Sequence, residues 1–448
     1  MIFQPKSLFW LRALCGLAVG LLVGVVMLAA FVQWRLARYL RGEQFRRLIS
    51  EQTSAALGVQ GDYLPLQWAG MTAYSDGFYG RGLQDSPIRE VRADQIRASF
   101  GLSGRFRTRW RIGNVQIGRL HLKVSLAGQS LSKPEEKKPA AGAKRHLLVP
   151  LLVQEANIEW STSCGSTGTL QRTKMEVTPN RNFLDCELRG GDLRLTDLPP
   201  LQVEEAKIRV HKDQASLRES RLQLADGGRL IVNGQIGRDA ATELDLNVHF
   251  EDVPLHRWLP TDWRGRLIGL AHGEARLSGR MGVAGASRSE GRIELSNARL
   301  EALPMLNRLA VFTGSEQFRQ LQLQKARADY WWRNGQLVVE RILLESVGLL
   351  RLEGRFTLEN DIVNGEFDVG VASSVLRWLP GARSRVFTIE RDGYRWTKMR
   401  VQGPTNDLQE NLSGRLLAAA SAEAIETTKE ALQKGAEALL GIFHKLTQ

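Results

Sequence analysis

The sequence predicts a mainly β protein in which strand units repeat along the chain, with a transmembrane helix at the N-terminus and an amphipathic helix at the C-terminus. Three observations predict this. Beyond Gly61, short runs alternate apolar and polar residues, which is typical of half-buried strands. The chain repeats part of itself at an offset of 120 residues. No charged residue stands between Arg12 and Arg35.

The uncharged segment near the N-terminus is long enough, as a helix, to cross a bilayer core of about 30 Å. Trp10 and Trp34 flank it, as expected of membrane interfaces. A cleaved signal peptide is the alternative, but its apolar region would span only about 7–15 residues. We therefore expect an uncleaved anchor whose helix continues to about Leu57. Charge alone does not fix its orientation, because arginines follow the span while long domains cross membranes largely regardless of charge.

The body of the chain alternates in polarity over many short segments, such as 115–126 and 244–250. The 43 glycines fit a turn-rich antiparallel sheet. The predicted divisions are 1–60 for the transmembrane helix and its helical extension, 61–127 for a β-rich N-terminal part of the sheet, 128–146 for a disordered charged linker, 147–288 for a β-repeat region, 289–412 for a C-terminal β module and 413–448 for the C-terminal helix.

The internal repeat aligns residues 201–236 with 321–356 without a gap, and the sequence RWLP at 257–260 recurs at 377–380. Within the second copy, Asn334-Gly335 is a strong signal for a two-residue hairpin. A repeat of this size predicts stacked supersecondary units.

The strands of both copies place apolar residues at alternate positions, which puts them on one face of a sheet. The predicted stripe comprises Leu222, Leu224, Leu230, Val232, Ile236, Leu244, Leu246, Val248, Phe250, Ile342, Leu344, Leu350, Leu352, Phe356, Phe367, Val369 and Val371. An ordinary closed core and an open ligand-binding surface both explain it. Glutamate substitutions at the equivalent positions Val232 and Leu352 distinguish the closed core from the open surface. In a closed core the buried carboxylate should unfold the protein, whereas on an open surface both variants should stay abundant but inactive.

Two cysteines flank strand-like segments. In an oxidising compartment Cys164 and Cys186 would form a disulfide, and the alternative is two separate buried thiols. No ligand spacing predicts a metal site, and no cofactor is expected.

The chain lacks the residue patterns of known catalytic motifs, so we do not expect an enzyme. The net charge of +13 suits either nucleic acid or an anionic membrane surface. Arginines are spread evenly rather than clustered with aromatic residues, and a membrane anchor is predicted, so no nucleic-acid partner is expected.

The C-terminal segment 413–446 predicts a long amphipathic helix, because Ile425, Leu432, Leu439 and Leu446 recur every seven residues. Its acidic and basic residues nearly cancel, whereas a helix that binds anionic lipid should be more basic. We expect this helix to pack on protein, over one end of the sheet or against another copy, rather than on a membrane.

The C-terminal module resembles the AsmA-like superfamily, which includes AsmA, TamB and YhdP. The resemblance rests on the run SEGRIELSNARLEALPMLNRLA at 289–310 and on the strand, Asn-Gly turn, strand succession that follows Phe318. It covers about 289–415 well, 150–260 moderately and 60–150 weakly.

The resemblance implies an elongated, twisted antiparallel β-groove in a single-pass protein of the bacterial inner membrane, with most of the chain in the periplasm. It implies lipid binding or transfer between inner and outer membrane, with acyl chains of phospholipid or another acyl lipid held along the apolar stripe. Together with the Cys164–Cys186 pair, it places the residues after about 35 in the periplasm, and the expected partners are other envelope proteins or a second copy bound through the C-terminal helix. The alternative is a non-enzymatic scaffold or assembly factor for outer-membrane biogenesis with a closed β core.

Overall fold

The structure, a computed structural model, describes residues 42–446 with gaps at 85, 104–108, 127–148, 163–166, 181, 197, 212–213, 238–242, 260, 281–286, 302–305, 308–309, 311–315 and 377–380. The predicted transmembrane segment and the charged linker 128–146 lie outside these residues. Among the helices that the structure describes, none combines the length and apolarity needed to span a bilayer.

The prediction of a mainly β protein is confirmed. The N-terminal strands are β1 (Val59–Tyr63), β2 (Leu66–Ala69), β3 (Thr72–Gly82), β4 (Ile88–Ser103), β5 (Arg109–Leu126), β6 (Leu151–Thr162) and β7 (Thr167–Pro179), preceded by helix α2 (Glu43–Leu57). The next strands are β8 (Leu184–Arg189), β9 (Asp192–Leu195), β10 (Leu201–Val210), β11 (Gln214–Leu224), β12 (Arg229–Gly237), β13 (Glu243–Pro254), β14 (Leu267–Arg280) and β15 (Arg288–Glu301).

The C-terminal strands are β16 (Gln320–Leu323), β17 (Lys325–Arg333), β18 (Gln336–Ser346), β19 (Leu350–Glu359), β20 (Ile362–Ala372), β21 (Ile389–Arg391), β22 (Tyr394–Pro404) and β23 (Gln409–Glu410). Short helical turns connect some of them: η1 (Leu255–Arg257), η2 (Thr261–Trp263), η3 (Glu316–Phe318), α4 (Ser373–Leu376) and η4 (Ala382–Val386). The last element is helix α5 (Leu412–Leu446).

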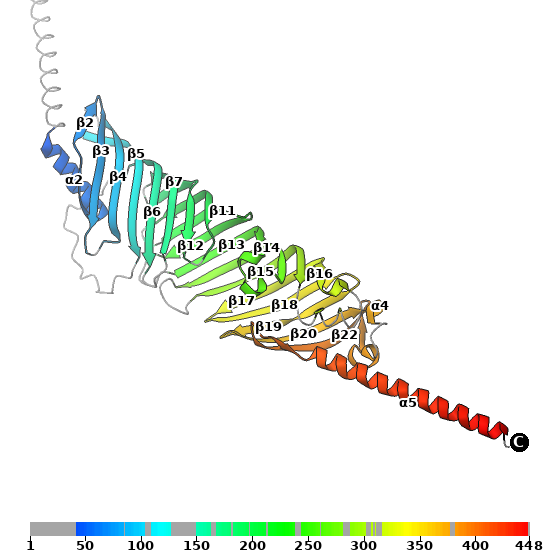
Figure 1. Cartoon of the computed structure of the whole chain (residues 1–448). Coiled ribbons are helices and arrows are strands. Elements are labelled where there is room, and N and C mark those ends of the chain that lie inside the picture. Colours follow the sequence, from blue (N-terminus) through cyan, green and yellow to red (C-terminus); the bar gives the residue numbers. More distant parts are fainter. Residues whose placement is uncertain are drawn as a thin grey trace, which may run out of the picture. The chain divides into compact units, whose positions relative to one another are not determined.

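The chain divides into two compact units. The N-terminal unit comprises Met1–Thr162 and Thr167–Pro179, and the C-terminal unit comprises Ser163–Ser166 and Asn180–Gln448. In the N-terminal unit β1 and β2 pair with the same side of β3, and β4 to β7 follow in chain order (Figure 1). All its pairs are antiparallel except β5–β6, which is parallel. A parallel pair needs a long crossover, and the residues between Leu126 and Leu151 provide it.

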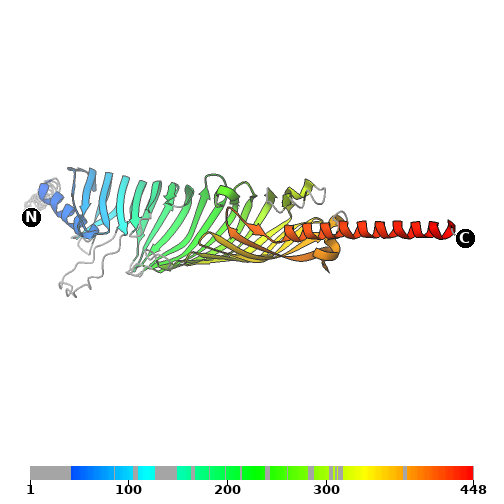
Figure 2. The same ribbon diagram turned by 60° about the horizontal axis from the view of Figure 1, so that its bottom comes forward.

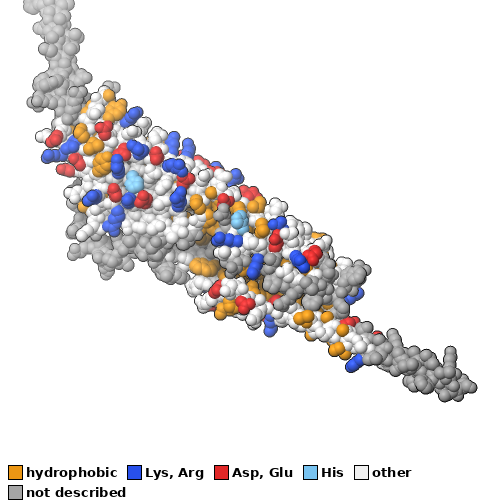
Figure 3. Space-filling view, in the orientation of Figure 1, with side chains coloured by type: hydrophobic (Ala, Val, Ile, Leu, Met, Phe, Trp, Pro, Cys, Tyr) orange, Lys and Arg blue, Asp and Glu red, His pale blue; other side chains and the backbone are white. Residues whose placement is uncertain are grey.

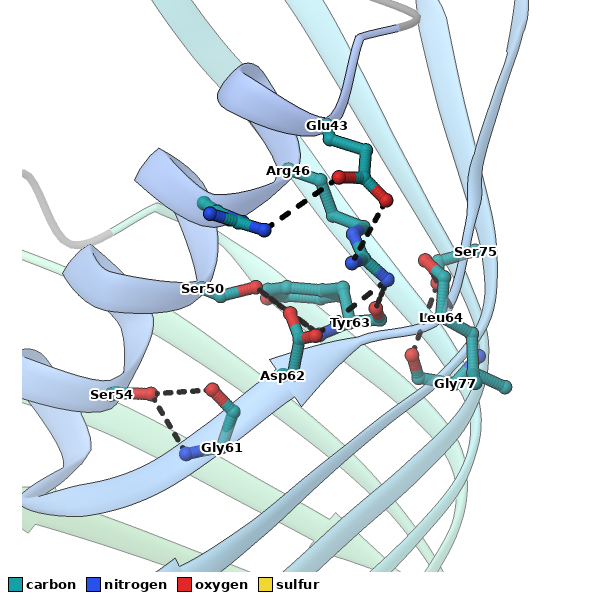
Figure 4. Close-up of polar contacts among 11 residues, drawn as sticks. Glu43, Arg46, Ser50, Ser54, Gly61, Asp62, Tyr63, Leu64, Ser75 and Gly77 are labelled. Carbon is teal, nitrogen blue, oxygen red and sulfur yellow. Dashed lines mark hydrogen bonds and ion pairs between the residues drawn. The ribbon is translucent and has the colours of Figure 1, made fainter.

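Helix α2 closes the edge of the N-terminal sheet (Figure 4). Ser54 donates to the Gly61 carbonyl at 3.0 Å and accepts from the Gly61 N–H at 3.1 Å. One turn earlier, Ser50 accepts from the Tyr63 N–H at 3.2 Å, while Arg46 donates to the Tyr63 carbonyl at 3.2 Å. Side chains of the helix therefore take the place of a neighbouring strand, which protects β1 from pairing with another chain.

The C-terminal unit is antiparallel throughout its described strands. β8 and β9 both pair with β10, and the strands from β10 to β15 pair in chain order. β16 and β17 both pair with β15, and β17 to β20 again pair in chain order. β20 then pairs with one edge of β22, and β21 and β23 pair with the other edge of β22. The repeat is visible in this order, because β10 to β13 correspond to β16 to β20. The predicted hairpin at Asn334-Gly335 joins β17 to β18, with φ angles of 53° and 78°, as a two-residue hairpin requires.

The main core of the C-terminal unit lies at one end of its strands. Fully buried Leu321, Val369 and Val371 from the sheet meet Phe318 and Phe387 from the connecting segments. The predicted C-terminal helix is confirmed as α5, and its first turns join this core. Figures 1 and 2 show that α5 then runs on beyond the last strands. Ile425, the first member of the seven-residue series, is exposed.

Candidate apolar binding face

Strand register brings the predicted stripe residues to one face of the C-terminal sheet. In the first copy Leu230 lies opposite Phe250, Val232 opposite Val248, and Ile236 opposite Leu244. Residues directly opposite in a sheet point to the same side. In the second copy Leu344 lies opposite Leu352, which in turn lies opposite Val369.

Two strands between the copies, β14 and β15, and β17 of the second copy continue this face, although the predicted stripe did not include their residues. Leu246 lies opposite Leu277 of β14, and Ser289 of β15 lies opposite Trp332 of β17. The segment 271–279 does alternate, but its inward residues are mostly alanine and glycine, so its hydrophobic signal is weak. The charged residues of β14, which all fall at alternate positions, could have shown that the residues between them belong to the apolar face.

We call this surface the apolar face. It comprises Ala215, Leu217, Ser220, Leu222, Leu224, Leu230, Val232, Gly234, Ile236, Leu244, Leu246, Val248, Phe250, Val253, Ala271, Gly273, Ala275, Leu277, Gly279, Ser289, Gly291, Ile293, Leu295, Ala326, Ala328, Tyr330, Trp332, Leu337, Val339, Ile342, Leu344, Leu350, Leu352, Gly354, Phe356, Leu358, Val363, Gly365, Phe367, Val369 and Val371. All the predicted stripe residues belong to it, and none of these positions carries a charged side chain.

The two ends of the apolar face differ in burial. At the covered end, Leu224, Leu350, Val369 and Val371 are buried beneath or beside the connecting segments. Toward the turn end, which carries the Asn334-Gly335 turn, the apolar side chains are only half-buried. These include Val232, Ile236, Leu246, Val248, Val339 and Phe356. Trp332 there is 36% exposed. Figure 3 shows hydrophobic side chains among charged ones on one side of the C-terminal unit.

The opposite face of the same strands is polar and ion-paired. Arg276 of β14 forms two hydrogen bonds of 2.9 Å with Asp245 of β13. Arg292 of β15 contacts Asp329 of β17 at 2.9 Å. The hydrogen bonds from these guanidinium groups lower the pKa of the Asp245 and Asp329 carboxyls. The sheet therefore has one charged, water-facing side and one uncharged side.

Glycines on the apolar face let neighbouring strands approach closely. Gly234 and Gly273 have φ angles of 148° and 152°, which other residues rarely adopt. A Cβ at either position would collide with the backbone of the next strand, at Asp245 and Arg292 respectively. Interior glycines of this kind mark bends in strands.

Cys186 of β8 is a free, half-buried thiol in the structure, whereas Cys164 lies outside the described residues, so their disulfide stays a prediction. Burial raises the pKa of the Cys186 thiol to about 11. Because the thiolate is the reactive form, we expect Cys186 to resist alkylation in the folded protein at pH 8.

Thiol counting by mass spectrometry checks this expectation and the disulfide together. The protein is unfolded without reductant and then alkylated. If Cys186 is a free thiol, all three cysteines should react, whereas a Cys164–Cys186 disulfide would leave only Cys15 to react. Rapid alkylation of Cys186 in the native protein would contradict its burial.

Within the ranges that the structure describes, no group of three His, Cys, Asp or Glu side chains is arranged to hold a metal ion. No protein-family model, curated protein or solved structure matches the chain.

Proposed function

We propose that this chain is a non-enzymatic, AsmA-like lipid-binding or lipid-transfer protein of the bacterial envelope. It is anchored in the inner membrane by its N-terminal helix, with most of the chain in the periplasm. The apolar face is the wall of a groove that holds acyl chains on their way between the inner and outer membranes. The partner is phospholipid or another acyl lipid.

The observation that carries this proposal is the apolar face, which runs from β11 to β20, is uncharged and is half-buried over much of its area. The other side of the same sheet carries ion pairs. Leaving such a continuous apolar surface in water is unfavourable, and large patches of this kind mark binding surfaces. At about 4.8 Å per strand the face extends roughly 40 Å. Half of a bilayer core is about 15 Å thick, so the face is long enough for more than one acyl chain.

A second candidate is a structural scaffold or assembly factor for outer-membrane biogenesis. The tightly packed core at the covered end, with Phe318, Phe387 and Leu412 fully buried, favours it. In that case the whole face would serve packing, and no lipid would reach it.

Site-specific photocrosslinking in bacterial cells separates the two candidates. A benzophenone amino acid at Val248, on the apolar face, is expected to acquire the mass of a lipid after irradiation. The matched control is Asn247, the next residue of β13, which is exposed on the opposite face. Equal lipid labelling at both positions, or none at Val248, would refute lipid binding on this face.

A further inference from the structure

Two arginines meet at the turn end of the sheet without a carboxylate partner. Arg288 is the first residue of β15 and Arg333 the last of β17, and the register places them directly opposite each other. Both side chains are exposed, and neither forms an ion pair with any described residue. Like charges directly opposite each other destabilise a sheet. A bound anion would remove this repulsion.

Two arginines deeper in the neighbouring strands do have carboxylate partners. Arg292, four residues further along β15, contacts Asp329 at 2.9 Å, and Arg276 of β14 contacts Asp245 at 2.9 Å. Glu290 lies on the same face as Arg288 but is opposite Trp331 and forms no ion pair with Arg288. Among the described residues, the sheet therefore supplies carboxylates to Arg276 and Arg292 but none to the Arg288–Arg333 pair.

The arginine pair lies at the rim of the sheet, next to the half-buried part of the apolar face, although both side chains leave the strands on the opposite, charged face. Trp332 directly precedes Arg333, and its side chain lies on the apolar face while that of Trp331 lies on the opposite face. Tryptophan suits a boundary where one side is apolar and the other wet. Because both strands end here, the long arginine side chains are at the rim of the sheet, within reach of a group that projects past the turn end.

We propose that Arg288 and Arg333 bind the phosphate of an anionic acyl lipid whose chains lie on the apolar face. This inference rests on the proposed function and adds a headgroup site to it. Guanidinium groups bind phosphate oxygens in a bidentate manner, and a phosphate between the two arginines removes their repulsion. The same chemistry would bind free phosphate, so the test includes that source.

The test uses the full chain in detergent and compares two fluorescent lipids with identical acyl chains, phosphatidylglycerol and uncharged diacylglycerol. The double variant Arg288→Ala/Arg333→Ala is expected to bind phosphatidylglycerol about tenfold more weakly and diacylglycerol unchanged. Arg327→Ala is the matched control, because Arg327 is an exposed arginine near the start of β17 that forms no ion pair with any described residue. It is expected to bind both lipids as the parent chain does.

The outcomes separate the headgroup site from the proposed function. Unchanged phosphatidylglycerol binding in the double variant, or an equal loss for both lipids, would overturn the headgroup site. Calorimetric binding of inorganic phosphate that is as tight as that of the lipid, and is lost in the double variant, would assign the arginines to a free anion instead. If the parent chain binds neither lipid, the proposed function fails and the headgroup site with it.

Discussion

Val232→Glu is expected to leave the C-terminal unit folded while abolishing lipid binding, whereas Leu352→Glu, at the equivalent position of the repeat, is expected to destabilise the fold. Val232 is half-buried and lies opposite Val248, outside the packed cores of the unit. A carboxylate there can reach water, so the free energy of unfolding should fall by only about 1 kcal/mol. It would nevertheless place a charge among the acyl chains.

Leu352 is half-buried like Val232, but it packs against the main core and lies opposite Val369, which is fully buried. A glutamate there would put a carboxylate beside side chains that offer it no partner, at a cost of about 3 kcal/mol or more. The repeat alone predicts the same outcome for both variants. The structure separates them, because the connecting segments bury the second copy more deeply than the first.

Urea unfolding and lipid crosslinking at Val248 measure the two effects. Val232→Thr and Leu352→Met serve as uncharged controls of similar size and should remain close to the parent chain in stability. Loss of both glutamate variants by proteolysis would show that the apolar face is a closed core along its whole length. Lipid crosslinking that persists in a folded Val232→Glu protein would place the lipid elsewhere.

The sequence predicted those elements whose signal is local. The hairpin at Asn334-Gly335 and the alternation of β12, β13 and β19 depend on residues that are neighbours in the chain, and all are present. The apolar face of β14 was missed because alanine and glycine bury little area each. Its position between the two copies, set by pairing across the sheet, is what makes it part of the surface.

Contacts between distant elements were beyond the reach of the sequence. Ser50 and Ser54 look like ordinary polar helix residues until the fold places them against the edge of β1. The cover of one end by Phe318, Phe387 and Leu412 likewise depends on two connecting segments and the start of α5, which are far apart in the chain. The arginine pair at 288 and 333 follows from register, which the sequence does not fix across a long connection.

Helix α5 has two parts with different contacts, and two truncations separate them. Leu412, Leu416 and Ala419 in its first turns are buried in the main core. Arg415 donates to the Lys398 carbonyl at 2.6 Å and to the Thr397 hydroxyl at 2.7 Å, so it covers the part of β22 between the residues that pair with β21 and β23. Further along, Ile425 is exposed, and Glu426 forms an ion pair with Arg385.

A chain that ends at Asn411 is therefore expected to aggregate, whereas one that ends at Thr428 should stay folded and monodisperse in detergent. The shorter chain loses two buried leucines, each worth about 2–5 kcal/mol when truncated to alanine, and their sum approaches the whole stability of a typical domain. It also exposes the edge of β22 to pairing with other chains. Size-exclusion chromatography and limited proteolysis of both truncations, beside the full chain, measure the difference. If the chain ending at Asn411 instead remains monodisperse and loses only its binding to liposomes, α5 is a membrane-binding helix and its packing on the core is not needed for folding.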